Sequence, residues 1–407
     1  MGITSLTYEP PVRRSERRER LDYGLLEAAV AAFDEGRHAE SLAKTFEHLF
    51  PGATPPRLEA APFSFAQGSS RVTAYLEGGD VVIAVPLARL PPGGKAVAAL
   101  RYVLTKISCP GQLYQPRLRG DDLWLEFRDS LDRAHPSKIV EVLRRMPVEA
   151  DNNDDWLIGQ FGALPLDRAD IAPLDDAEFA RAEVLWRRHW ADVEELVKEC
   201  QRKGSVFFLN EVTAYALYLV RFALPLGGHV GTRLAESAAI FNDNQQDAHK
   251  REAALSKCAR DMKAVPADEL KKSLGHASYA ISPLGDGTPK VLSGYLGAGN
   301  YRDSIEQFKR SGKSSEAALA LVGTYTYLLA CFAWPEAVES ALKEGLAKAS
   351  GEPWQRAANL LFDHARGVVD AFAGDDGEGP GGGAEGPAAG GEGGDGGDDG
   401  DDEDGGE

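Results

Sequence analysis

The chain has 407 residues, is 43% hydrophobic and 27% charged, and carries a formal net charge of −18 at pH 7. Its length exceeds what a single hydrophobic core usually serves, so we expect two or three domains. The stretch from Gly374 to Glu407 holds 13 acidic and no basic residues, which leaves 50 acidic against 45 basic residues in the remainder. A body with a net charge of only −5 lacks the cationic face that nucleic-acid binding requires, so we expect no nucleic-acid partner.

Residues 1–21 are predicted to form a polar, basic lead-in that is exposed to solvent. Glutamates interrupt its run of arginines, which comprises Arg13, Arg14, Glu16, Arg17, Arg18, Glu19 and Arg20. These glutamates weaken the alternative, an arm for nucleic acid or anionic lipid. No apolar segment of a secretory signal is present, and the cysteines, at 109, 200, 258 and 331, form no closely spaced pair. We therefore predict a cytoplasmic protein of bacterial type.

Residues 22–165 are predicted to form an α+β domain with an antiparallel sheet. Two helices, 22–34 and 38–50, come first, with Gly36 as a cap and Pro51 as a stop. Strands are expected near 63–66, at 71–76 and 81–85, and then at 112–118 and 123–128. A helix at 94–108, with a core stripe of Val97, Leu100, Val103, Leu104 and Ile107, separates the two groups of strands. Helices at 136–146 and 154–161 complete the domain.

This order, α-βββ-α-ββ-α, resembles the type III secretion chaperone fold and the related YbjN-like proteins of bacteria. The resemblance covers roughly residues 22–165 and lies in topology and hydrophobic pattern. It implies a non-enzymatic module that binds partner chains, often as a dimer. No motif accompanies it, so it carries no functional residues over to this sequence.

Residues 175–373 are predicted to form an all-α domain after a linker at 164–175. Apolar residues recur every three or four positions from Phe179 to Cys200, which indicates a long helix that Asp175 or Asp176 caps and Gly204 ends. Further helices are expected at 206–224, 232–265, 268–274, 301–309, 316–334, 336–349 and 354–372. A glycine-rich loop is expected at 275–299. The tail, 374–407, is predicted to be disordered because it has no large apolar side chains.

Three short motifs resemble known binding sites. Gly312-Lys313-Ser314 ends like a phosphate-binding loop, but Gln307 occupies the position of the first glycine and the preceding segment is predicted to be helical. Residues 151–155, Asp-Asn-Asn-Asp-Asp, alternate like a calcium loop, but a helix N-terminus rich in capping acids explains them better. Residues 390–395 match one repeat of a calcium-binding β-helix in a biased tract.

No site for catalysis, a cofactor or a metal is predicted. The eight histidines lie at 38, 48, 135, 189, 229, 249, 276 and 364, and none belongs to a His-Glu-x-x-His motif. Two apolar stretches raise the question of a membrane span. The first, 206–224, contains Asn210, Glu211 and Arg221, and the second, 317–334, is at the short limit for a bilayer. A buried central helix is the preferred interpretation of the second.

The leading functional prediction is a non-enzymatic protein-binding module, chaperone-like or an adaptor, with a partner of unknown identity and possible homodimer formation. The alternative is a component of a membrane-associated or stress-response assembly that docks through its helical domain. An enzyme with an unrecognised site comes third, because one sequence cannot reveal spatial triads.

Overall fold

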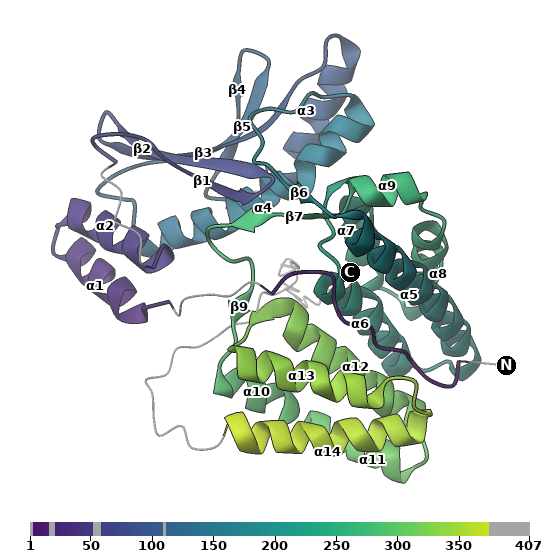
Figure 1. Ribbon diagram of the computed structural model, residues 1–407. Helices are drawn as coiled ribbons and strands as arrows, with labels where there is room; N and C mark the ends of the chain where they lie inside the picture. The colour runs from purple at the N-terminus through teal and green to yellow at the C-terminus, as the bar shows by residue number, and fades with distance from the viewer. Residues whose placement is uncertain (1–2, 16–20, 52–57, 109–110, 374–407) are drawn as a thin grey trace, which may run out of the picture. The chain divides into compact units, whose positions relative to one another are not determined.

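The computed structural model describes residues 3–15, 21–51, 58–108 and 111–373 (Figure 1). It confirms the predicted fold class, an antiparallel sheet with helices followed by a helical region. The residues from Met1 to Gly374 belong to one compact unit. That unit holds two hydrophobic cores, one centred on the sheet and one among the later helices. The acidic tail and its motif at 390–395 lie outside the described residues.

The sheet has six strands in the order β4-β5-β3-β2-β1-β8, and all its pairs are antiparallel. The helices of this part are α1 (Tyr23–Asp34), α2 (His38–Leu49), α3 (Gly94–Lys106) and α4 (Pro136–Phe161). Its strands are β1 (Phe63–Gly68), β2 (Ser70–Glu77), β3 (Asp80–Arg89), β4 (Gln115–Arg119), β5 (Asp122–Ser130) and, from far along the chain, β8 (Ser278–Tyr279).

Only one face of this sheet joins the hydrophobic core. Side chains alternate along a strand, and Ile83, opposite Ala74 and Phe127, lies on the face that packs against the helices. Helix α4 runs along that side of the strands (Figure 1). Val82, opposite Tyr75 and Arg128, lies on the other face, where long side chains rather than a described helix shield it.

Helix α4 corrects the prediction of two helices, 136–146 and 154–161. It is continuous over 26 residues and passes through Pro147, although a proline inside a helix has no N–H to donate to the preceding turn. The hydroxyl of Ser70 donates to the Pro147 carbonyl at 3.2 Å, and the next turn is tied to the sheet by buried aspartates. These long-range contacts hold the helix together across the proline.

The helical part starts at Asp175, which caps α5 with a capping box as predicted, and Gly204 ends that helix. Its helices are α5 (Asp176–Lys203), α6 (Val206–Ala223), α7 (Gly228–Phe241), α8 (Ala248–Lys263), α9 (Ala267–Lys272), α10 (Pro289–Leu296), α11 (Asn300–Arg310), α12 (Ser314–Cys331), α13 (Glu336–Ala349) and α14 (Trp354–Phe372). The short strands β6 (Ala172–Pro173) and β7 (Gly275–His276) pair with each other, as do β9 (Gly285–Asp286) and β10 (Phe332–Ala333).

The single helix predicted at 232–265 is wrong, because the chain breaks into α7 and α8. Asp247 caps α8 by accepting from the N–H groups of His249 and Lys250. The buried Arg251 donates to the carbonyl of Phe241, the last residue of α7, at 3.0 Å, and to Asn210 Oδ1 at 2.8 Å. The end of α7 and the start of α8 are thus both capped, which stabilises the corner between the two helices.

The loop predicted at 275–299 is also wrong. It contains α10 and three short strands, and Thr288 caps α10 by accepting from the N–H of Val291. One of the strands, β8, extends the sheet at β1. Glycine-rich sequence therefore did not prevent ordered structure, because a sheet edge was available for pairing.

Helix α12 is a central helix of the helical core. Most of its side chains are buried, and it packs against α6 and α14. By length and composition alone, α6 is the one helix among the described residues that could cross a membrane, and 67% of that stretch is buried inside the protein.

The basic lead-in predicted at 1–21 needs correction where it is described. Residues 3–15 are extended and lie against the helical part, with Leu6 and Val12 buried in its core. Their aliphatic side chains stabilise this position, although the composition around them is polar.

Candidate partner-binding surface

The motif at 151–155 forms a partly buried ionic cluster in the second half of α4, with Asp154 at its buried end. Asp151 Oδ1 accepts from the N–H of Ser69 at 2.6 Å, and Asp154 Oδ2 accepts from the Ser69 hydroxyl at 2.8 Å. The Arg168 guanidinium contacts Asp154 at 3.0 Å and Asp155 at 2.7 Å. The prediction of a helix N-terminus is therefore wrong. The motif lies inside α4 and links this helix to the β1–β2 turn and to the linker that follows α4.

Burial dominates the electrostatics of this cluster. Loss of water raises the pKa of Asp154 to about 7 despite the nearby Arg168, and it also raises the pKa of Asp151. Gly68, at φ +65°, allows the close approach, because a Cβ there would lie 2.6 Å from Asp151 Oδ2. No group of three or more His, Cys, Asp or Glu side chains suited to a metal is found among the described residues.

The other candidate residues lie in different parts of the fold. Gly312 and Lys313 follow helix α11 instead of the strand that a phosphate loop requires. The histidines are dispersed: His189 is buried, which lowers its pKa to about 4, His229 stacks on Trp156, and His364 lies 3.0 Å from the Tyr325 hydroxyl. Cys200 and Cys258 are buried thiols whose pKa is raised to about 12 by burial.

The core stripe predicted for α3 is only partly correct. Val103 and Ile107 are buried, but Leu104 is 60% exposed and Val97 is 52% exposed. The inner side of α3 packs against α4, where Tyr102 contacts Trp156 and Phe161, while Val97 and Leu104 lie on its outer side. The outward-facing half of this stripe is a surface that sequence periodicity alone could not separate from core.

Strand β4, at the open edge of the sheet, also carries exposed apolar side chains. Leu118 is 52% exposed, and Leu113, just before the strand, is 38% exposed. We call Val97, Leu104, Leu113 and Leu118 the α3–β4 surface. Exposed apolar groups that gather in one segment, rather than singly, are typical of interaction sites.

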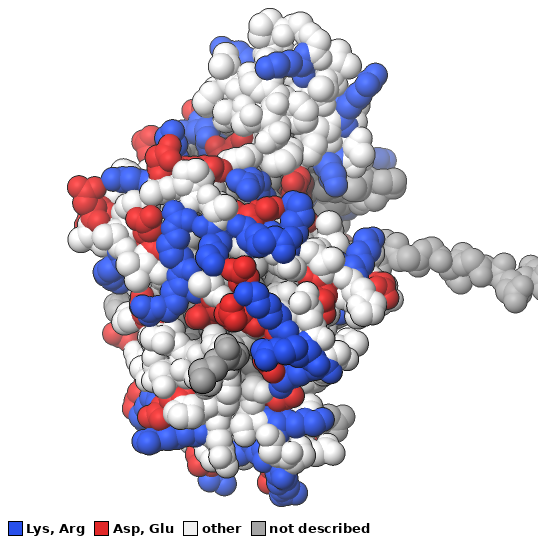
Figure 2. All heavy atoms as spheres, turned by 90° about the vertical axis from the view of Figure 1, so that its right-hand side faces the viewer, with Lys and Arg blue, Asp and Glu red and all other residues white. Residues whose placement is uncertain are grey.

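The segment that contains the α3–β4 surface carries charges of a single sign, although Arg117 and Arg119 alternate with Leu118 along β4 and Arg119 is paired with Glu126. Residues 93–119 contain Lys95, Arg101, Lys106, Arg117 and Arg119 and no acidic residue. In Figure 2, blue and red groups alternate over most of the face, whereas the upper end, at the height where Figure 1 places α3 and β4, is white and blue. On this face, the upper end is therefore apolar and basic.

The open face of the sheet beside β4 is polar and internally paired. Arg119 lies 4.8 Å from the centre of the Trp124 ring and forms an ion pair with Glu126, which is 8% exposed. Arg128 also reaches Glu126, at 3.4 Å, and pairs with Asp80 at 3.3 Å. Because these groups satisfy one another, we place the candidate site at the α3–β4 surface instead.

Comparisons with family models, with curated proteins and with solved structures found no match for this chain. The resemblance to secretion chaperones thus remains a prediction from topology.

Proposed function

We propose that the protein is a non-enzymatic protein-binding module, chaperone-like or an adaptor, and that its partner docks on the α3–β4 surface. The observation that carries this proposal is the exposure of Val97, Leu104 and Leu118 within a segment that has five basic residues and no acidic one. Burial of one such side chain contributes about 1.5–3 kcal/mol, so three or four of them can anchor a partner.

The chemistry of the surface specifies the kind of partner. Pro116 lacks an N–H, and Arg117 and Arg119 are charged, which are features that discourage the addition of another strand to β4. Exposed apolar side chains in a segment that is basic and has no acidic residue favour an amphipathic partner segment with acidic flanks, such as a helix. Two copies of this chain would bring two basic surfaces together, so we propose a different protein as the partner rather than a symmetric dimer through this surface.

Capture by the tagged full-length chain tests this function. Leu104→Asp and Leu118→Asp should each lose the same proteins from the captured set, as measured by quantitative mass spectrometry. Val184→Asp, a change at a side chain of α5 that is 51% exposed, is the matched control and should retain them.

Salt separates the proposal from its alternatives. Capture should weaken by a few fold between about 50 and 300 mM salt, because the cations contribute while apolar contact dominates. Enrichment of nucleic acid instead of protein, or one captured set shared by all variants, would contradict the proposal.

A further inference from the structure

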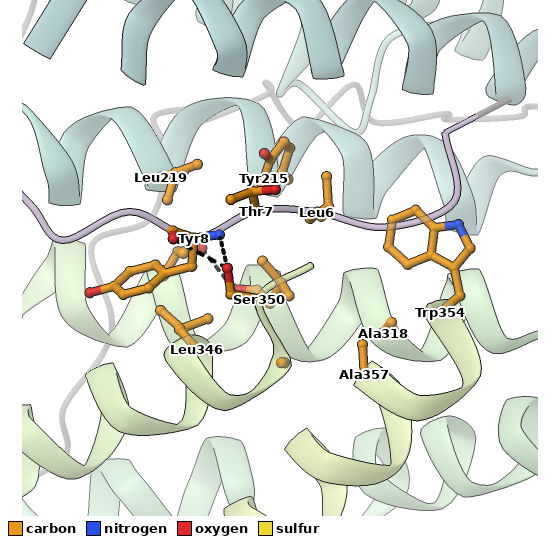
Figure 3. A pocket seen from close by; sticks show the side chains of 13 residues that line it. Leu6, Thr7, Tyr8, Tyr215, Leu219, Ala318, Leu346, Ser350, Trp354 and Ala357 are labelled. Atoms are coloured by element: carbon orange, nitrogen blue, oxygen red, sulfur yellow. Dashed lines mark hydrogen bonds between the residues drawn. The ribbon is translucent and has the colours of Figure 1, made fainter. Parts of the chain in front are cut away.

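The N-terminal segment, residues 3–15, lies in a groove of the helical part between α6 and the corner that joins α13 to α14 (Figure 3). The N–H of Gly351 donates to the Leu6 carbonyl at 2.8 Å. The N–H of Tyr8 donates to the Ser350 hydroxyl at 2.9 Å, and Trp354 Nε1 donates to the Ile3 carbonyl at 2.9 Å. The corner thus binds the main chain of the segment rather than its side chains.

The other end of the segment is held by the C-terminus of α6. The N–H groups of Val12 and Arg13 both donate to the Ala223 carbonyl, at 2.8 and 3.0 Å. The Arg13 guanidinium donates to the Arg221 carbonyl at 2.9 Å. These carbonyls have no partner inside the helix, so an extended chain satisfies them in the way that a cap would.

Two apolar side chains anchor the segment in the helical core. Leu6 is 9% exposed and Val12 is 6% exposed, whereas Thr4 and Pro10 are exposed. Beside Leu6 remains a cavity of about 30 Å³, lined by Tyr215, Leu219 and Leu346 among others (Figure 3). The groove is therefore apolar at its base and is not completely filled by the segment.

Helix α5 contacts the segment with a series of charges in antiparallel order. Arg188 forms an ion pair with Glu9, Arg181 donates to the Pro11 carbonyl at 3.2 Å, and Glu178 lies 3.5 Å from Arg14. Main-chain bonds, two apolar pockets and ordered charges are the elements by which proteins bind extended peptides from other chains.

We propose that this groove is a binding site for extended peptides and that residues 3–15 occupy it as an intramolecular competitor. The peptide it takes has an aliphatic residue in the position of Leu6, an acid three residues later, and an aliphatic residue followed by a basic one at the positions of Val12 and Arg13. Because the groove and the α3–β4 surface are separate, the test of one proposal can fail while the other proposal stands.

The test uses the full-length chain with the substitutions Leu6→Asp and Val12→Asp, which weaken the attached segment. A fluorescently labelled peptide of residues 3–15 should bind this variant with a dissociation constant on the order of 10 µM by anisotropy. The wild-type chain should bind it at least about tenfold more weakly, because the attached segment competes at a millimolar effective concentration. Thr4→Asp with Pro10→Asp, which adds the same charges at exposed positions, should behave as wild type.

Two further outcomes decide the case. A folded Leu6→Asp, Val12→Asp variant, with native circular dichroism, that binds the peptide no better than the wild-type chain would overturn the proposal. A dimer of the wild-type chain at high concentration that this variant loses would support the groove and make a second copy the donor of the peptide.

Hydrogen exchange of the wild-type chain gives an answer even where the variant does not fold. The amides of Tyr8 and Val12 should exchange at least about 100-fold faster than those of α12, because the segment detaches without global unfolding. Exchange of both regions at the same rate would show that the segment is a permanent part of the core and that it cannot be displaced by another peptide.

Discussion

The two edges of the sheet differ in whether another strand pairs with them. At the β1 edge, β8 adds a sixth strand, and Gln67 exchanges two hydrogen bonds with the backbone of Ile281, with its Nε2 donating and its Oε1 accepting at 2.9 Å. The Asp151–Arg168 cluster lies behind the adjoining turn. At the β4 edge no described strand pairs beyond β4, and Leu118 is exposed. A strand of the same chain thus covers the end of β1, whereas the edge at β4 is left with exposed apolar and basic groups.

Removal of the cation behind the closed edge should have the largest effect. Arg168→Leu leaves Asp154 and Asp155 without their partner and should lower the free energy of unfolding by about 3–5 kcal/mol at pH 8. Urea denaturation measures the change. Arg117→Leu at the open edge is the control and should stay within about 0.5 kcal/mol. Equal effects at both edges would contradict the comparison.

The glutamine that joins β1 to Ile281 comes next. Gln67→Ala leaves two buried backbone groups without partners and should cost about 2 kcal/mol in urea denaturation. Gln115→Ala on β4 removes a glutamine that is exposed at the opposite edge, and a cost of a few tenths of a kcal/mol is expected. A Gln67→Ala variant as stable as the wild type would mean that β8 does not depend on this side chain.

The closed edge should also respond to pH. The pKa of Asp154 is raised to about 7, so between an ordinary value of about 3.9 and 7 the folded chain holds a proton that the unfolded chain has released. The unfolding free energy should therefore fall as pH rises through this window, by about 2–3 kcal/mol between pH 5 and 8. Asp154→Asn should flatten this part of the pH profile, and an unchanged profile would show that another group titrates there.

The smallest effect on stability is expected at the open edge. Leu118→Ser should change the unfolding free energy by less than about 0.5 kcal/mol, because the side chain is already 52% exposed. Its effect should instead be seen as weaker partner capture. A loss of several degrees in melting temperature would show that Leu118 belongs to the core.

Local sequence determined most of the elements and where they begin. Asp175 and Gly204 delimit α5, and the apolar stripe of that helix, with Trp186 and Trp190, is buried as its spacing predicts. The two glycines at 78 and 79, both at positive φ, form the turn between β2 and β3, with Glu77 opposite Asp80. Such signals lie within a few residues of one another, so they can be recognised in the sequence alone.

Tertiary structure decided what those elements do. Pro147 should end a helix, yet contacts from Ser69, Ser70 and Arg168, remote in the chain, carry α4 past it. Val103 and Leu104 both fit the apolar stripe predicted for α3. Only the packing of α3 against α4 decides that Val103 is buried and Leu104 is exposed. The pairing of β8 with β1, and the burial of Leu6 and Val12 against α6 and α13, join residues over two hundred positions apart. Burial and pairing at that separation depend on the assembled fold, and no local period encodes them.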